Sequence, residues 1–172
     1  PTIDPIPDLT ATEHKPFTYQ VNAFDPDLIW GDTLRFSDDT DLFTINRTTG
    51  KISFTPTEEQ VGVHEVMVVV TDNRSASASS RFKLTVMNVN DPPSVEPIAP
   101  QTAMQGRPFR LQVNASDPDT ISDPEERLRF SDDRPLFDID AATGVINFTP
   151  THDQLGEHDA NITVTDRGGL SA

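Results

Sequence analysis

The 172-residue sequence contains no cysteine, so disulfide bonds cannot stabilise it, and the redox compartment of the protein stays undecided. Long hydrophobic runs are also missing, because no apolar stretch approaches the ~20 residues of a membrane-spanning helix. The chain opens on Pro1 without the charged and apolar segments of a secretion signal. We therefore expect an internal piece of a longer protein, with no direct membrane insertion in this segment.

Basic residues are scarce. Lysine and arginine number 13 against 28 aspartates and glutamates, which gives a formal net charge of −15. A surface of this sign repels nucleic acids and anionic membranes and attracts cations. Nucleic acid is therefore excluded as a partner.

Patterns of catalytic residues are missing too. His64 and His158 occupy one repeated position and are interpreted as structural, and the chain has neither a Gly-x-Ser-x-Gly motif nor a glycine-rich phosphate loop. Pairs of aspartates resemble the carboxylate dyad of a glycosidase, but their duplication along the chain favours a structural ion over an active site. The sequence predicts that this chain is not an enzyme.

What the chain does contain is an internal repeat. The segment from Asp25 to Asp72 recurs from Asp117 to Asp166 with the shared motifs LRFSDD, FTPT and VTD. The period of about 92 to 94 residues is too long for a solenoid unit and suits a small β-sandwich domain. We predict two domains, residues 1–91 and residues 92–172.

Alternating segments predict an all-β fold. Apolar and polar residues alternate over 17–23 and 109–115, as in half-buried strands. Thr-Gly and Thr-Pro-Thr turn signals separate further short strands, and no segment shows a 3.6-residue apolar period. We predict two tandem Greek-key β-sandwiches. The remaining expected strands are 34–36, 43–45, 52–54, 64–71 and 81–89 in the first repeat and 128–130, 137–139, 145–148 and 158–165 in the second.

The second repeat has no counterpart of the strand at 81–89, because Ala172 aligns with Ala78. A sandwich without its last strand exposes an apolar face and an unpaired edge. One explanation is a truncated chain. The other is that another copy or another segment donates the strand in trans.

Acidic residues recur at the ends of the predicted strands. Each Asp-Pro-Asp follows one strand, and a further aspartate ends a later strand that should reach the same pole of the sandwich. Carboxylates that converge without a nearby lysine or arginine demand a cation, and Ca²⁺ accepts six to eight oxygen ligands. The alternative is that these residues form turns by capping backbone amides. The candidate metal ligands are Asp25, Asp27 and Asp72 in the first repeat, Asn90 and Asp91 at the junction, and Asp117, Asp119 and Asp166 in the second repeat.

Several of these motifs carry a resemblance to a known family. The "NVNDPP" junction at 88–93, the Asp-x-Asp pair at 117–119 and the "VTD" at 164–166 resemble the inter-domain Ca²⁺ ligand set of the cadherin superfamily. The segment 137–166 is similar to the dystroglycan-type cadherin-like and Ig-like repeats of secreted proteins. The resemblance implies cadherin-like sandwiches with Ca²⁺ as the cofactor, in an extracellular or cell-surface protein.

The chain also departs from the family pattern. The vertebrate "DRE" ligand motif is not evident, and the first-strand acid is at best Glu13, with Gln105 at the aligned position. Either Glu58 or Glu59 is a further candidate ligand. These departures imply that fewer ions bind, or that they bind with weaker affinity, than in vertebrate cadherins.

Five Asn-x-Ser/Thr sequons raise the expectation of a glycoprotein, since the side chains on predicted strands should face solvent. The alternative is that a threonine-rich β protein contains sequons without using them. The sequon asparagines are Asn46, Asn73, Asn114, Asn147 and Asn161.

Trp30, the only tryptophan, lies beside the first Asp-Pro-Asp. It either packs against a preceding domain or stacks on a sugar ring or another partner.

Together these features predict a calcium-stiffened extracellular repeat module of a surface, adhesin, sheath or filament protein. Its expected partners are other repeats of the same protein or identical subunits. The alternative is a carbohydrate-binding module of a secreted protein that interacts with polysaccharide, and a third reading is homophilic cell adhesion.

Overall fold

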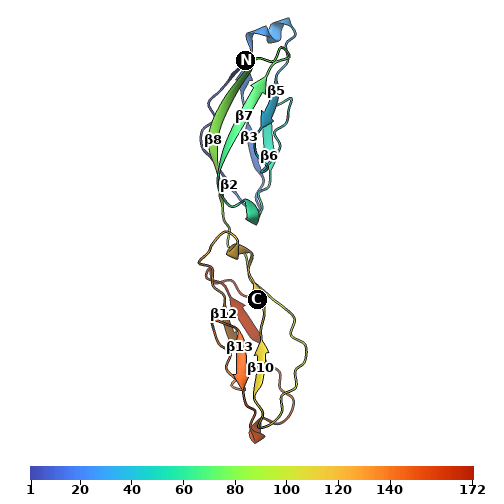
Figure 1. Ribbon diagram of the computed structural model, residues 1–172, viewed down its shortest axis with the longest axis vertical. Helices are drawn as coiled ribbons and strands as arrows, with labels where there is room; N and C mark the ends of the chain where they lie inside the picture. Colours follow the sequence, from blue (N-terminus) through green and yellow to red (C-terminus); the bar gives the residue numbers. More distant parts are fainter. The chain divides into compact units, whose positions relative to one another are not determined.

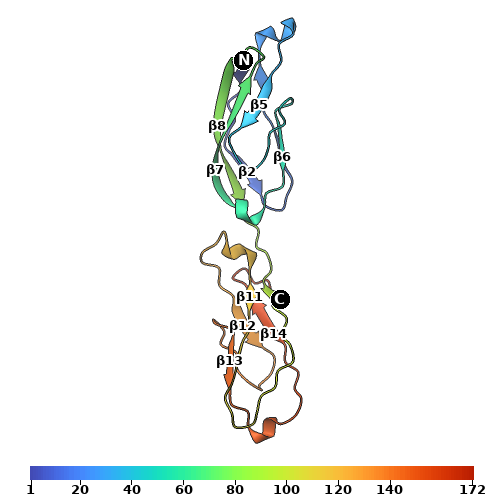
Figure 2. The same ribbon diagram turned by 45° about the vertical axis from the view of Figure 1, so that its right-hand side comes forward.

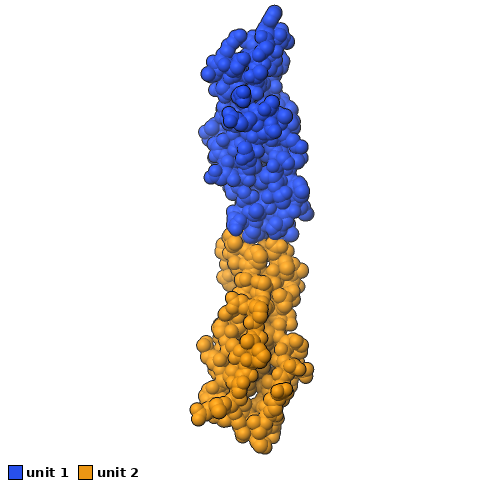
Figure 3. Space-filling model, turned by 90° about the vertical axis from the view of Figure 1, so that its right-hand side faces the viewer, with its two compact units in different colours: residues 1–89 blue, residues 90–172 orange.

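The computed structural model describes residues 1–172, which form short strands joined by turns and 3₁₀ segments. The chain divides into two compact units, residues 1–89 and residues 90–172, coloured separately in Figure 3. Asn90 and Asp91, which the repeat analysis assigned to the first domain, make their hydrogen bonds within the second unit.

The first unit is a sandwich of two β layers (Figures 1 and 2). One layer is a four-stranded sheet in the order β2-β8-β7-β5, in which β2 runs parallel to β8 and the other pairs are antiparallel. The other layer pairs β3 with β6 and β1 with β4. The strands are β1 (Thr2–Ile3), β2 (Leu9–Thr12), β3 (Phe17–Gln20), β4 (Ala23–Phe24), β5 (Arg35–Asp38), β6 (Lys51–Phe54), β7 (Gly62–Thr71) and β8 (Ser77–Met87).

The alternation of apolar residues explains why these strands pack as layers. Alternate side chains are buried over 66–70 of β7 and over 82–86 of β8, and the intervening ones are more exposed. Thirteen buried apolar residues form the resulting core. Three of them come from β8, namely Phe82, Leu84 and Val86.

The Thr-Gly turns of both units require glycine. Gly50 has φ = 69° and Gly144 has φ = 67°, a left-handed conformation that glycine adopts without strain. A Cβ atom on Gly50 would lie 2.9 Å from the Phe36 ring, and one on Gly144 would lie 2.8 Å from the Phe130 ring. In both units, therefore, only a residue without a Cβ atom fits between this turn and the core aromatic ring.

The second unit has the same pairings with fewer strands. Its strands are β9 (Ser94–Val95) with β11 (Ala115–Ser116), β10 (Phe109–Gln112) with β13 (Val145–Phe148), and β12 (Arg129–Asp132) with β14 (Ile162–Thr165). Only four apolar residues are buried in its core, Val113, Phe130, Ile146 and Val164. The all-β tandem sandwich predicted from the sequence is confirmed.

The lack of a β8 counterpart explains this thinner core. Val164 exchanges two backbone hydrogen bonds of 3.0 Å with Ala172, and Thr165 bridges Ser171, as Val70 pairs with Ala78 in the first unit. Beyond Val164 this edge of β14 has no partner strand, so β14 is four residues long where β7 is ten. The expected strand at 158–165 is therefore correct only over its second half.

Two other expected strands are wrong. Residues 43–45 and 137–139 form no strand, and only Ile139 makes an isolated bridge, to Ile146. The preceding turn supplies the physical reason, because a carboxylate oxygen of Asp38 accepts the Ile45 N–H at 2.9 Å. Backbone groups satisfied in this way do not need a sheet partner.

Candidate functional site

The Asp-Pro-Asp of the second unit forms a tight, preorganised turn. Asp117 caps the 3₁₀ turn η3 (Pro118–Thr120), and its Oδ1 accepts the Asp119 N–H at 2.9 Å. Proline at the first position of the turn sets the backbone angle that the turn requires. Asp119 Oδ2 in turn accepts the Asp91 N–H at 2.8 Å. The two aspartates and the junction are thereby joined.

Asp166, at the end of β14, holds the other junction residue. Its Oδ2 accepts a hydrogen bond from Asn90 Nδ2 at 2.8 Å, and its Oδ1 accepts the Leu170 N–H at 2.8 Å. The five candidate ligands of this unit thus form two hydrogen-bonded sets, which meet at the adjacent residues Asn90 and Asp91. We call them together the bonded group.

The structure adds an acid that the sequence analysis missed. Glu126 is buried, and its Oε1 accepts the backbone N–H groups of Arg127 and Arg167 at 2.9 Å each. Its counterpart in the first unit is Asp32. The two loops differ in length, so no shared motif indicated this position, although both repeats have an acid just before the Leu-Arg-Phe-Ser-Asp-Asp stretch.

Burial makes this group of carboxylates electrostatically costly. Asp117, Asp119 and Asp166 are each 4% exposed or less, and Asp117 Oδ2 and Asp119 Oδ1 have no hydrogen-bond partner. Burial raises the pKa of Asp117, and the nearby charges of Asp119, Glu126 and Asp166 raise it further. The oxygen donors suit a hard cation such as Ca²⁺, which would offset both the desolvation and the mutual repulsion.

This raised pKa predicts a pH dependence for the metal-free protein. An acid whose pKa is higher in the folded state binds more protons there, so its contribution to stability falls as the pH rises above the ordinary value of 3.8. In chelator, the melting temperature of Asp117→Asn should therefore gain on that of the unchanged protein between pH 4 and pH 7. A difference that does not vary with pH would contradict the electrostatic account.

Gly168 controls the position of Asn90. A Cβ atom at Gly168 would lie 2.1 Å from the Asn90 side-chain oxygen, so alanine there must displace the amide that bonds Asp166. We expect Gly168→Ala to weaken Ca²⁺ binding by the second unit, about tenfold if one charge-assisted hydrogen bond is lost. Titration calorimetry measures this, with Thr149→Ala as a control, since Thr149 is exposed and lies outside the bonded group. Unchanged affinity would show that Asn90 is dispensable.

The first unit carries a related group. Ligand atoms of Asp25, Asp27 and Asp32 lie within 4.8 Å of one another, and Asp25 and Asp32 are buried. Asp25 Oδ1 accepts the Asp27 N–H at 2.8 Å, as Asp117 Oδ1 accepts the Asp119 N–H in the second unit. Asp32 Oδ2 has no hydrogen-bond partner.

Three other candidate ligands of the first unit lie outside this group of three aspartates. Asp72 accepts the backbone N–H groups of Arg74 and Ala76, both at 2.8 Å, and so closes its own turn. Glu13 is fully buried, and one of its carboxylate oxygens accepts the Val89 N–H. Glu58 is buried at the start of the 3₁₀ turn η2 (Glu58–Gln60).

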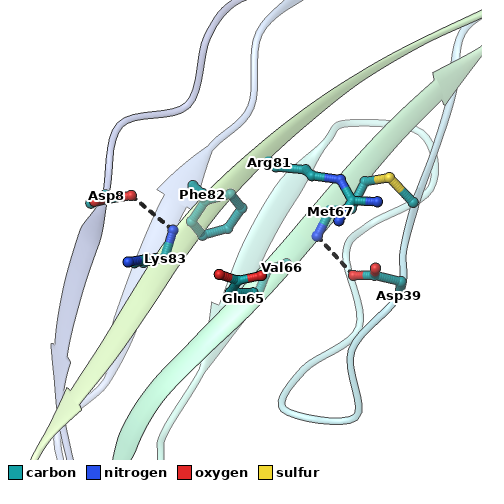
Figure 4. A pocket seen from close by; sticks show the side chains of 8 residues that line it. All are labelled: Asp8, Asp39, Glu65, Val66, Met67, Arg81, Phe82 and Lys83. Carbon is teal, nitrogen blue, oxygen red and sulfur yellow. Dashed lines mark hydrogen bonds between the residues drawn. The ribbon is translucent and has the colours of Figure 1, made fainter.

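Acids beside the four-stranded sheet accept hydrogen bonds from backbone groups of β7 and β8 at the points where a neighbouring strand ends. Asp39 accepts the Met67 N–H at 2.7 Å, and Asp8 accepts the Lys83 N–H at 2.8 Å, one on each side of the shallow cleft over β7 and β8 (Figure 4). These amides lie just beyond the residues that pair with β5 and β2. Asp133 repeats the role of Asp39 by accepting the Asn161 N–H.

All five sequon asparagines are exposed. Three of them already use their side chains in the fold. Asn46 accepts the Thr48 and Thr49 N–H groups, Asn114 donates to Glu96, and Asn161 donates to Asp133. The structure contains no helix of the length and apolarity needed to cross a membrane.

Comparisons with known proteins agree with this architecture. Mouse cadherin-23 EC22-24 matches with a TM-score of 0.62 and 16% identity, over 97% of this chain and 59% of that one. Drosophila N-cadherin EC1-4 matches with a TM-score of 0.57 and 19% identity, over 96% of this chain and 46% of that one. The chain therefore spans less than two thirds of either structure, and the likeness concerns the fold. No curated protein matches the sequence.

At the level of sequence, the family described as Putative Ig domain matches residues 1–87. This match covers the whole first sandwich and half of the chain, and the second sandwich repeats its motifs. The chain belongs to the Putative Ig domain family, and its two repeats have the cadherin-like fold.

Proposed function

We propose that this chain is a calcium-stiffened repeat module of an extracellular surface, adhesin, sheath or filament protein. The observation that supports this most strongly is the bonded group of Asp117, Asp119 and Asp166, with buried carboxylate oxygens that no protein group satisfies. A structural ion is the chemistry that such a group favours, because the oxygens need a cation and no catalytic residue accompanies them.

The junction residues explain how an ion would stiffen the chain. Asn90 and Asp91 follow β8 closely in sequence, and both bond the aspartates of the second unit. Pro92 and Pro93 restrict the next residues to extended conformations. An ion held here would bind residues of this linker and so restrict its motion. The partners of such a module are other repeats of the same protein.

Titration of Ca²⁺ into metal-stripped protein tests the proposal. We expect saturable heat and a rise in melting temperature, since a ligand specific for the folded state stabilises it by about 2.7 kcal/mol at a hundredfold excess over Kd. Sodium at matched ionic strength is the control, because screening alone also relieves repulsion among acids. No saturable heat and no rise beyond the sodium control would overturn the proposal and leave the acids as turn formers.

Strand donation between subunits is a second part of the proposal. The edge of β14 beyond Val164 has no partner strand, and the bonds between Val164 and Ala172 set an antiparallel register along it. A strand from an identical subunit would pair in this register and cover apolar residues that are only partly buried. Sedimentation over a concentration series tests this, because a well-folded monomer at all concentrations would contradict donation as a requirement.

A further inference from the structure

The first unit also contains a cleft of about 460 Å³ beside η1 (Pro26–Trp30). Its walls come from the end of β3, the loop that precedes β5, and the Thr48–Thr49 turn. Leu28 of η1 and Asp32 also line it. The cleft therefore lies next to the group formed by Asp25, Asp27 and Asp32.

The lining of this cleft defines the kind of ligand that it suits. Amides and hydroxyls of Gln20, Asn22, Thr33 and Thr48 lie around an apolar wall that includes Leu28. No lysine, arginine or histidine lines it, and its one charged residue is an acid. A phosphate or sulfate would meet repulsion there, whereas a neutral polyhydroxylated ligand would find donors and acceptors without an unpaired charge.

Asp32 supplies a group that needs a ligand. It is 7% exposed, and its Oδ2 has no hydrogen-bond partner although the residue lines the cleft. This oxygen is covered by protein atoms, so an ion held by the three aspartates would satisfy it. A ligand hydroxyl would reach it after a small movement of the Asp32 side chain toward the cleft.

Trp30 is an exposed aromatic residue close in sequence to the cleft, although it does not itself line it. It is 77% exposed and lies in sequence between Leu28 and Asp32, both of which line the cleft. Gly31, with φ = 90°, ends η1 by bonding back to Asp27 and Leu28, so the loop that carries the indole is held by backbone bonds. An exposed, well-anchored indole provides a flat apolar face with a polar N–H.

The second unit provides an internal comparison. Its corresponding loop is longer and more acidic, contains no aromatic residue, and places Arg127 where Thr33 stands in the first unit. The combination of cleft, exposed indole and buried acid is thus a property of the first unit.

We propose that this cleft binds a neutral oligosaccharide, with a sugar ring stacked on Trp30 and hydroxyl groups bonded to Asp32 and the threonine and amide side chains. The part played by an ion at Asp25, Asp27 and Asp32 rests on the proposed calcium function, whereas the stacking and the lining of the cleft do not.

The single tryptophan makes the test direct, because its fluorescence reports only on this site. The probes are soluble hexasaccharides of glucose, xylose and mannose, with a sulfated oligosaccharide for comparison, each titrated in Ca²⁺ and in chelator. We expect a saturable fluorescence change with at least one neutral probe, and none with the sulfated one. By calorimetry, Trp30→Ala should weaken that binding about fivefold or more, with Ca²⁺ binding unchanged. The control Ile121→Ala, an exposed apolar residue of the corresponding loop in the second unit, should leave both unchanged.

Three outcomes would overturn the inference. They are no binding of any neutral probe, binding of the sulfated probe alone, and neutral binding that survives Trp30→Ala. If Ca²⁺ binds normally in any of these cases, the proposed calcium function stands while the sugar site fails. If sugar binds equally well in chelator, the sugar site stands without an ion.

Discussion

Replacing Asp119 with asparagine is expected to destabilise the second unit in Ca²⁺ and to stabilise it in chelator. In calcium the variant should be less stable than the unchanged protein and bind the ion at least about tenfold more weakly, because Ca²⁺ affinity depends on the number of charged ligands. In chelator it should be the more stable of the two, because a buried like charge next to Asp117 and Asp166 has been removed. Scanning calorimetry in both conditions measures this reversal.

The geometry makes Asp119→Asn a clean substitution. Asparagine keeps an oxygen that can accept the Asp91 N–H, so the 2.8 Å bond to the junction is retained. The matched control is Asp27→Asn, the same repeat position in the first unit, where the side chain is about half exposed. It should change the stability of the second unit in neither condition. If Asp119→Asn destabilises the protein equally with and without calcium, the carboxylate acts only as a turn former.

Adding a strand to the second unit is expected to produce the largest gain in stability. The designed extension places the sequence of Ser79–Met87 directly after Ala172, which continues the register in which Ala172 pairs with Val164. Three large apolar side chains would then cover a core that now buries only four residues. After the entropy of ordering the new strand, we expect a stabilisation on the order of 2 kcal/mol, roughly 10 °C for a domain of this size.

Hydrogen exchange localises this effect. Backbone amides of residues 156–162 should become protected in the extended chain, because β14 lengthens toward the ten residues of β7. The control extension has serine at the positions that correspond to Phe82, Leu84 and Val86. An equal gain with this control would mean that backbone pairing, rather than apolar burial, stabilises the unit, and no gain with either would contradict the register.

The sequence was most informative where the repeats agree. Asp117, Asp119 and Asp166 could be predicted as one group because each ends a strand or begins a turn in both repeats. Glu126 could not be predicted, since it comes from a loop whose length differs between the repeats. It comes close to Asp117 and Arg167 only in the folded unit. Gly168 was missed for a related reason: its effect on Asn90 depends on a contact between segments 78 residues apart.

The sequence by itself determined the duplication, the all-β class and the placement of acids at the strand ends. Alternation, turn residues and repeated carboxylates are local properties of the chain. Only the tertiary structure decided which expected strands exist, since strand pairing depends on distant partners. Residues 43–45 are left without a strand by the carboxylate of Asp38, and β14 is shortened by the lack of a partner like β8. Tertiary structure likewise decided which carboxylate oxygens are buried without a partner, because burial is set by every segment that packs around them.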